Sequence, residues 1–210
     1  MRTSSFSEVK KTIQEYMQLR PMFRAQKTDQ FNVFRILGIA SDEMRHSRIL
    51  AWLLEAESEH GQSSDFLKAF AALCGIALNS HDLLDYTVVT ELAVLESIID
   101  IAVYKPGSFL IYIENKVFAV EGNQQLLREF SDLRRLGAAM RVPETRQYAI
   151  FLTPTGREPV SAGPSQWISI SYGQISAVFR SVVSKIEGAK TRWLIQDWLA
   201  IIESWGITID

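Results

Sequence analysis

The chain has 210 residues, of which 47% are hydrophobic and 22% charged, and its formal net charge at pH 7 is -2. This length suits one well-cored globular domain and is short for two. A slightly acidic chain is not built to bind phosphate backbones over its whole surface, so any nucleic-acid site must be local.

The amino terminus and the cysteine content predict a soluble, cytoplasmic protein. Residues 1–11 lack the apolar core of a signal peptide, and no uncharged apolar stretch approaches bilayer-spanning length. The single cysteine, Cys74, lies in the apolar run 70–76, which is typical of a small buried hydrophobic side chain. With one cysteine no disulfide forms within the chain, as expected in a reducing compartment.

The first 80 residues predict a helical lead-in. Apolar residues recur at helical spacing over 6–19, and Pro21 closes that segment. A capping residue followed by acidic residues predicts a helix over 41–57, and the serines before Asp65 predict another over 64–75.

The rest of the chain predicts a sheet followed by alternating strands and helices. Runs rich in β-branched and aromatic residues indicate strands over 87–92, 98–104 and 109–117, with a turn at 105–108. After Gly122 the sequence predicts a helix through Leu136. Two further strands follow, at 147–152 and 167–172, and then two closing helices. We therefore expect an α/β fold with a central mixed sheet, in one domain over 1–210: a lead-in over 1–80, a sheet core over 87–172 and C-terminal helices over 173–210.

Charged residues interrupt two of the predicted strands. Asp100 lies between two isoleucines, and Glu114 ends the run Ile111-Tyr112-Ile113, with Lys116 two positions on. Because side chains alternate along a strand, Asp100, Glu114 and Lys116 are expected on one face of the sheet. The opposite, apolar face is expected to carry Ile99, Ile101, Val103, Ile111, Ile113 and Val117.

An antiparallel hairpin centred on Gly107 would make Asp100 and Glu114 direct cross-strand neighbours, unless a one-residue bulge shifts the register. Opposed Cβ atoms lie roughly 4.5–5.5 Å apart, and like charges placed this way repel. A divalent cation that prefers oxygen ligands, Mg²⁺ or Mn²⁺, resolves this repulsion and leaves coordination positions for water and a phosphate. Lys116 could then stabilise developing charge or position the attacking water. The alternative is a solvated edge hairpin in which Asp100 pairs with an arginine.

The strand with Asp100, the Ile-Glu-Asn-Lys segment 113–116 and the helix bearing Gln125-Leu126 resemble the PD-(D/E)xK nuclease superfamily. In particular they resemble its branch with an Ile-Glu-Asn-Lys strand. The Glu-x-x-His-Ser segment 43–47 is similar to the helical lead-in of the same branch, and the resemblance spans about 32–130. It implies a restriction-endonuclease-like core.

The resemblance also implies roles for individual residues. Asp100 and Glu114 would bind the metal, with the Asn115 carbonyl as a further ligand. Lys116 would be the catalytic lysine, and Gln125 would line the site from its helix. An ordinary solvated helix position is the alternative for Gln125.

Relatives often add an acid from a preceding helix, for which Glu43 is the first choice. His46 lies one helical turn along on the same face, and Glu91, on the strand before Asp100, is the competing choice for the third acid. Glu43 could instead be favoured at the start of its helix simply by the helix dipole, and His46 could be a hydrogen-bonded packing residue. The chain departs from its relatives at 97–99, where they commonly carry a Gly-Arg pair.

The function that the resemblance implies is a Mg²⁺-dependent nuclease, a hydrolase that cleaves nucleic-acid phosphodiester bonds, in phage defence or DNA repair. DNA is the preferred substrate on this resemblance, and RNA is the open alternative. One alternative is a non-catalytic nucleic-acid- or protein-binding module on a nuclease scaffold, which the net charge and the missing arginine favour. Another is a hydrolase of nucleotides or other small phosphoesters.

Two surface features bear on partners. A set of arginines could follow a phosphate backbone or form a solvated face mixed with Glu129, Asp132 and Glu144. The tryptophans near the C-terminus indicate core packing first, and their wide apolar band indicates a partner helix and hence a homodimer. The residues concerned are Arg128, Arg134, Arg135, Arg141 and Arg146, and Trp193, Trp198 and Trp205.

Overall fold

The computed structural model describes residues 10–18, 20, 31–161 and 166–205. Of the helix predicted over 6–19, residues 10–18 are helical. Residues 1–9 and 19, and Pro21, lie outside the described part of the chain.

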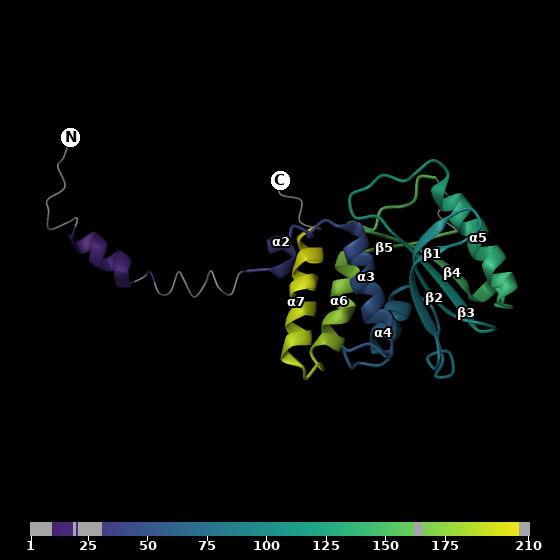
Figure 1. Cartoon of the computed structure of the whole chain (residues 1–210), viewed down its shortest axis with the longest axis horizontal. Helices are drawn as coiled ribbons and strands as arrows, with labels where there is room; N and C mark the ends of the chain where they lie inside the picture. The colour runs from purple at the N-terminus through teal and green to yellow at the C-terminus, as the bar shows by residue number, and fades with distance from the viewer. Residues whose placement is uncertain (1–9, 19, 21–30, 162–165, 206–210) are drawn as a thin grey trace.

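Helices and strands follow in nearly the predicted order (Figure 1). The helices are α2 (Val33–Ile36), α3 (Glu43–Leu54), α4 (Asp65–Leu73), α5 (Gln125–Ala139), α6 (Tyr172–Val183) and α7 (Ala189–Ser204), with a short 3-10 helix at Glu144–Arg146. The strands are β1 (Thr87–Ala93), β2 (Ile98–Lys105), β3 (Phe109–Asn115), β4 (Gln147–Thr153) and β5 (Ile168–Ser171). Every predicted strand is thus confirmed.

The five strands form one mixed sheet in the order β1-β2-β3-β4-β5. β1, β2 and β3 pair antiparallel, whereas β3, β4 and β5 pair parallel. One apolar core joins the sheet to α3, α4, α6 and α7, and a second lies between its other face and α5 (Figure 1). This confirms the α/β, restriction-endonuclease-like class, while the single domain over 1–210 stays a prediction.

The hairpin of β2 and β3 has the predicted register. Val103 pairs with Ile111 and Ile101 with Ile113, so the strands are centred on Gly107 without a bulge over these pairs. Gly107 has a φ of 73°, a left-handed conformation that a glycine adopts without steric cost in a tight turn. The recorded pairing stops one residue short of Asp100 and Glu114.

The expectation that Ile99 shares a face with Ile101 was wrong. Ile99 packs in the core beneath α5, whereas Ile101 packs in the core on the opposite side of the sheet. The alternation of side chains between the two faces of β2 fails around Asp100. The pairing of β2 with β1 omits Glu91, whose φ is 54°, and the pairing of β2 with β3 ends at Ile101. A residue with positive φ does not continue a pleated strand.

Cys74 is buried, as predicted, and burial raises the pKa of its thiol to about 12. Such a thiol is inert at neutral pH. Within the described ranges, no helix has the length and apolar character needed to cross a membrane.

Candidate active site

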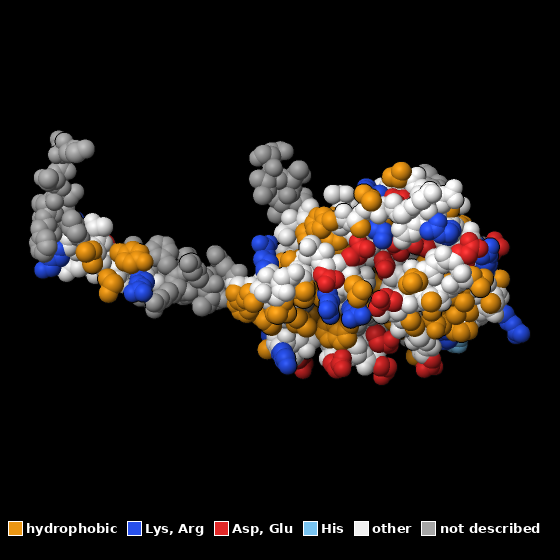
Figure 2. All heavy atoms as spheres, turned by 45° about the horizontal axis from the view of Figure 1, so that its top comes forward, with side chains coloured by type: hydrophobic (Ala, Val, Ile, Leu, Met, Phe, Trp, Pro, Cys, Tyr) orange, Lys and Arg blue, Asp and Glu red, His pale blue; other side chains and the backbone are white. Residues whose placement is uncertain are grey.

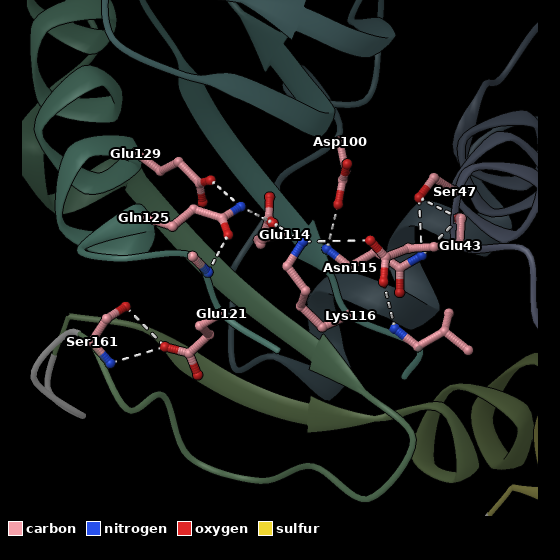
Figure 3. A network of polar contacts seen from close by, with 12 residues as sticks. Glu43, Ser47, Asp100, Glu114, Asn115, Lys116, Glu121, Gln125, Glu129 and Ser161 are labelled. Carbon is pink, nitrogen blue, oxygen red and sulfur yellow. Dashed lines mark hydrogen bonds and ion pairs between the residues drawn. The ribbon is translucent and has the colours of Figure 1, made fainter. Parts of the chain in front are cut away.

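Five of the predicted site residues, Glu43, Asp100, Glu114, Asn115 and Gln125, meet Lys116 where β3 ends, between the N-terminal ends of two helices (Figure 3). Glu114 and Asn115 are the last residues of β3, and Asp100 comes from the neighbouring β2. Glu43 is the first residue of α3 and Gln125 the first of α5. Asp42 caps α3 by accepting a hydrogen bond from the Arg45 backbone N–H, which fixes where the helix begins and therefore where Glu43 points.

Lys116 supplies the positive charge within this group of acids. Its Nζ lies 2.8 Å from Glu114 Oε1 and 3.4 Å from Glu43 Oε1. Burial alone would lower the pKa of Lys116, but Glu114, Glu43 and Asp100 raise it, so the side chain stays protonated. An ammonium therefore lies beside Glu114, on the face of the sheet where the sequence predicted Lys116.

Asp100 and Glu114 are both poorly hydrated. Asp100 Oδ2 accepts a hydrogen bond of 2.8 Å from the Asn115 backbone N–H. Burial raises the pKa of Asp100 to about 6, although this hydrogen bond and Lys116 act in the opposite direction. Burial, with the neighbouring Asp100 and Glu129, raises the pKa of Glu114 to about 9. Both groups would be expected to ionise more readily beside a cation.

Gln125 joins two carboxylates. Its Nε2 donates to Glu114 Oε1 at 2.5 Å and to Glu129 Oε1 at 2.8 Å, while its Oε1 accepts from the Gly122 backbone N–H. Gln125 is therefore not an ordinary solvated helix residue, because its amide is held between two acids on different elements.

Glu129 is a site neighbour that sequence reasoning missed. It is 1% exposed, and burial raises its pKa to about 7. The solvated-face reading of Glu129 and Asp132 was wrong, since both side chains are buried between α5 and the sheet. The available signal was their spacing: Gln125, Glu129 and Asp132 fall on one face of a helix, next to the apolar positions that pack on the sheet.

Two carboxylate oxygens in this group lack a partner. Among the buried side-chain atoms of the described residues, Glu114 Oε2 and Glu129 Oε2 make no hydrogen bond. A buried carboxylate oxygen without a donor is costly, and each such atom in a native site calls for an explanation such as an ion or a water.

Asn115 fixes the end of β3 to two helices. Its Nδ2 donates to Ser47 Oγ at 2.9 Å and to the Glu43 carbonyl at 3.1 Å, and its Oδ1 accepts from Tyr172 Oη at 2.9 Å. Glu43 Oε2 in turn accepts a hydrogen bond from the Val117 backbone N–H. Ser47, which belongs to the Glu-x-x-His-Ser segment, and Tyr172, which the sequence analysis did not single out, thus hold Glu43 and the strand end in place.

His46 lies in the core. Its Nδ1 accepts a hydrogen bond from the Trp198 indole N–H, so its Nε2 carries the proton and donates to the Ala40 carbonyl. The ring contacts Tyr172 and Trp205, and burial lowers its pKa. Since both ring nitrogens are occupied, the packing alternative describes His46, and the predicted catalytic role has no geometric support.

Both candidates for the third acid line the same hollow. A cavity of about 300 Å³ is bordered by Glu43, Glu91 and Asp100, among others. Glu91 pairs with Arg48 at 3.1 Å, and both side chains are about half exposed. Glu43 instead contacts Lys116 and is less exposed, so the geometry favours Glu43.

The basic residues around α5 are largely engaged by protein groups. Arg135 lies 2.6 Å from Glu96, Arg146 lies 2.9 Å from Asp82, and Arg134 donates to the Glu144 carbonyl. Figure 2 shows Lys and Arg side chains interspersed with Asp and Glu on the visible face, without a continuous basic track. Any local phosphate site therefore depends on few cations.

The C-terminal tryptophans are in large part core residues. Trp198 is fully buried, and Trp205 packs edge-on against Tyr172. Trp193 is 40% exposed and lies beside the ring of Phe31. At this end of α7 exposed apolar side chains remain that a partner could contact.

The donor chemistry of the site fits a divalent cation that prefers oxygen. Asp100 and Glu114 bring carboxylate oxygens into a desolvated position, and Glu114 Oε2 has no donor. Over the described residues, no three His, Cys, Asp or Glu side chains already form a cluster that could hold a metal. The residues thus fit such an ion by chemistry and burial, not by a preformed cage.

Comparisons with known proteins agree with the fold. Neither the curated proteins nor the solved structures include a match to this chain. The family model described as the PD-(D/E)XK nuclease superfamily matches residues 31–196, which include every candidate site residue. This match extends from α2 into α7 and covers most of the chain, so the chain belongs to the PD-(D/E)XK nuclease superfamily.

Proposed function

We propose that the chain is a metal-dependent nuclease that hydrolyses phosphodiester bonds of nucleic acid, with DNA as the preferred polymer. The observation that carries this proposal is the pairing of two desolvated acids, Asp100 and Glu114, with a protonated lysine that contacts Glu114. Superfamily membership supports the reaction class, and the preference for DNA rests on the same resemblance.

Asp100 and Glu114 would hold Mg²⁺ or Mn²⁺, with the Asn115 carbonyl and Glu43 as further oxygen ligands and Glu91 as the competing acid. When bound, such an ion stabilises charge on the phosphate and lowers the pKa of a water molecule. A water oxygen forms the new bond to phosphorus, and the bond from phosphorus to the leaving sugar oxygen breaks.

The protein groups have separate tasks in this scheme. Lys116 remains protonated, so it acts by stabilising negative charge on the phosphate and not as a base. Gln125 positions Glu114 through the 2.5 Å hydrogen bond, and Asn115 positions Glu43 through the Glu43 backbone. Holding the reacting groups in the correct geometry lowers the entropic part of the reaction barrier.

Within the superfamily we propose the branch with an Ile-Glu-Asn-Lys strand and a Glu-x-x-His-Ser helix, and a role in phage defence or DNA repair. Resemblance alone supports both. We also propose a homodimer that uses the exposed apolar side chains at the start of α7 and near α2: Phe31, Ile36, Leu37 and Trp193.

Cleavage assays test the proposed activity. Plasmid, linear and single-stranded DNA and RNA are incubated with wild type and with Asp100→Asn, Glu114→Gln and Lys116→Met, in Mg²⁺, Mn²⁺ or EDTA. We expect metal-dependent cleavage that each substitution reduces by roughly 10²-fold or more. Glu187→Gln, a change at an exposed glutamate, is the matched control and should cleave like wild type.

Equal cleavage by wild type and the three site variants would contradict the assignment. If wild type neither cleaves any polymer nor releases heat when titrated with Mn²⁺, the evidence would favour a non-catalytic binding module on this scaffold. Turnover of nucleotides without polymer cleavage would favour a small-phosphoester hydrolase.

A further inference from the structure

A second hollow adjoins the candidate active site. This cavity has a volume of about 740 Å³ and extends from Lys116 along the β3–α5 loop to the segment that follows β4. Lys116 is shared, since it lines the cavity and also contacts Glu114 and Glu43. The size falls within the range of sites for small organic ligands, roughly 300–1,000 Å³.

Glu121 holds the walls of this cavity together. Its carboxylate accepts hydrogen bonds from Arg157 Nη1 at 2.6 Å and from the Val160 backbone N–H. It also accepts from the backbone N–H and the Oγ of Ser161 (Figure 3). The Glu121 side chain is only 5% exposed. One buried carboxylate thus joins the β3–α5 loop to the loop after β4, so the cavity exists without a ligand.

Two aromatic rings border the cavity. Trp205 packs edge-on against His46 and Tyr172, at centroid distances of 4.7 and 4.8 Å, which fixes its orientation. Phe118 lies 5.8 Å from Trp205 and is 65% exposed. An exposed ring supported by a fixed neighbour offers a flat apolar surface for stacking.

The charges on the described lining argue against a phosphate ligand. Arg157 is already paired with Glu121, and Lys116 is directed to the phosphodiester site by its contacts with Glu114 and Glu43, so neither cation is left for a second phosphate in this cavity. Other polar groups on the lining are neutral hydroxyl and amide side chains, such as Thr155 and Asn123. A planar, uncharged ring with hydrogen-bonding edges matches this combination, and a nucleobase is such a ring.

We propose that the cavity binds an unpaired nucleobase of the substrate strand, stacked on Phe118, beside the phosphodiester at Asp100 and Glu114. The inference rests on the proposed nuclease function and narrows its substrate to single-stranded or frayed nucleic acid. A base within a duplex is stacked and paired, so it must leave the helix before it can enter a pocket of this kind.

Binding of two oligonucleotides of equal length tests the proposal. One is a labelled single strand of thymidine nucleotides, and the other has the same backbone with abasic sites in place of the bases. Fluorescence anisotropy is measured in EDTA, which prevents metal-dependent cleavage. We expect wild type to bind the strand with bases roughly tenfold or more tightly, and a paired duplex no better than the abasic strand.

Three variants locate the effect. Phe118→Ala should reduce affinity for the strand with bases roughly tenfold and leave affinity for the abasic strand unchanged, while Phe118→Leu should show an intermediate loss. Leu84→Ala removes a similarly exposed apolar side chain near Lys105, at the opposite end of β3, and should bind like wild type. Because Phe118 is exposed, the variants should retain the wild-type melting temperature.

Equal affinity of wild type for the two strands, including undetectable binding of both, would overturn the proposal. An equal loss for both strands in Phe118→Ala would do the same. Cleavage without base-dependent binding would leave the nuclease standing and remove the base site. Base-dependent binding that requires Phe118, without cleavage in Mg²⁺, would support the site and count against the proposed activity.

Discussion

Replacing Glu129 with glutamine should stabilise the protein at alkaline pH. Glu129 Oε1 accepts a hydrogen bond from Gln125, and a glutamine oxygen can accept the same bond. The other carboxylate oxygen, Oε2, is buried without a donor, and Glu114 Oε2 nearby is in the same condition. The amide would bring a donor to this acidic neighbourhood and remove one negative charge from it.

The magnitude follows from the pKa of Glu129. Burial raises it from its ordinary value of 4.5 to about 7, and each unit corresponds to about 1.4 kcal/mol, so the charged form is destabilised by ~3 kcal/mol. Asp100 also raises the pKa of Glu129, whereas Gln125, Lys116 and Glu114 lower it, and because these groups titrate together the expected gain is reduced to about 2 kcal/mol. For a chain of this size, that gain raises Tm by roughly 4–8 °C.

The gain should depend on pH in a defined direction. Below pH 4.5, Glu129 is protonated in both the folded and the unfolded chain, so its burial costs little. Between pH 4.5 and about 7 the unfolded chain releases this proton and the folded chain retains it, which lowers the stability of wild type as pH rises. Glu129→Gln lacks this dependence, so its advantage should be largest above pH 7.

Thermal melts monitored by circular dichroism at pH 4.5 and pH 8, both in EDTA, measure the difference. Glu187→Gln removes a charge from an exposed glutamate and serves as the matched control, with no change expected at either pH. If Glu129→Gln were no more stable than wild type at pH 8, or if its advantage were the same at pH 4.5, the burial argument would be refuted.

Three further predictions concern residues around the site. Glu121→Gln should lower the free energy of unfolding at pH 7 by about 1–3 kcal/mol, because a charged acceptor of several hydrogen bonds is lost. Burial opposes ionisation of Glu121, but Arg157 and the Ser161 N–H favour it, and the pKa is lowered to about 2. The difference in unfolding free energy between wild type and Glu121→Gln, measured by urea titration, should therefore be complete above pH 4.5 and vanish toward pH 2. His46→Ala should lower the free energy of unfolding by about 2–4 kcal/mol, because it leaves the Trp198 indole without an acceptor and opens a cavity in the core. The folded fraction should nevertheless cleave at a rate within threefold of wild type at 25 °C. A loss of cleavage comparable to that of Lys116→Met would restore a catalytic role for His46. Trp193→Glu should convert a dimer of the wild-type chain into a monomer in light-scattering measurements, whereas a monomeric wild type would remove the proposed interface.

Local features of the sequence were sufficient to predict the sheet and its central hairpin. The strands follow from alternating residues whose side chains face opposite sides, and the register of β2 and β3 follows from a tight turn at Gly107. Both depend on residues within about a dozen positions of one another. The wrong face predicted for Ile99 also has a local cause, the positive φ of Glu91. A glutamate at that position does not predict a positive φ.

Contacts between distant segments could not be predicted in the same way. Helical spacing placed His46 on the face of Glu43, but the hydrogen bond that occupies its Nδ1 comes from Trp198, 152 residues later. Glu129 lies beside Glu114 only because α5 packs on that face of the sheet. Glu43 and Glu91 border the same cavity, and sequence spacing alone could not show which of the two is the third acid.

The balance of charge at the site links metal binding to protons. Four carboxylates, those of Glu43, Asp100, Glu114 and Glu129, surround the single ammonium of Lys116 in the contact network of the described residues. With pKa values raised to about 6, 9 and 7, chiefly because burial disfavours their charged forms, Asp100, Glu114 and Glu129 carry protons over part of the neutral range. A divalent ion that binds to Asp100 and Glu114 must displace those protons, since metal ligands bind in the deprotonated form. At the proposed metal site, affinity for Mg²⁺ should therefore rise with pH through the same range in which burial of these acids lowers the stability of the protein.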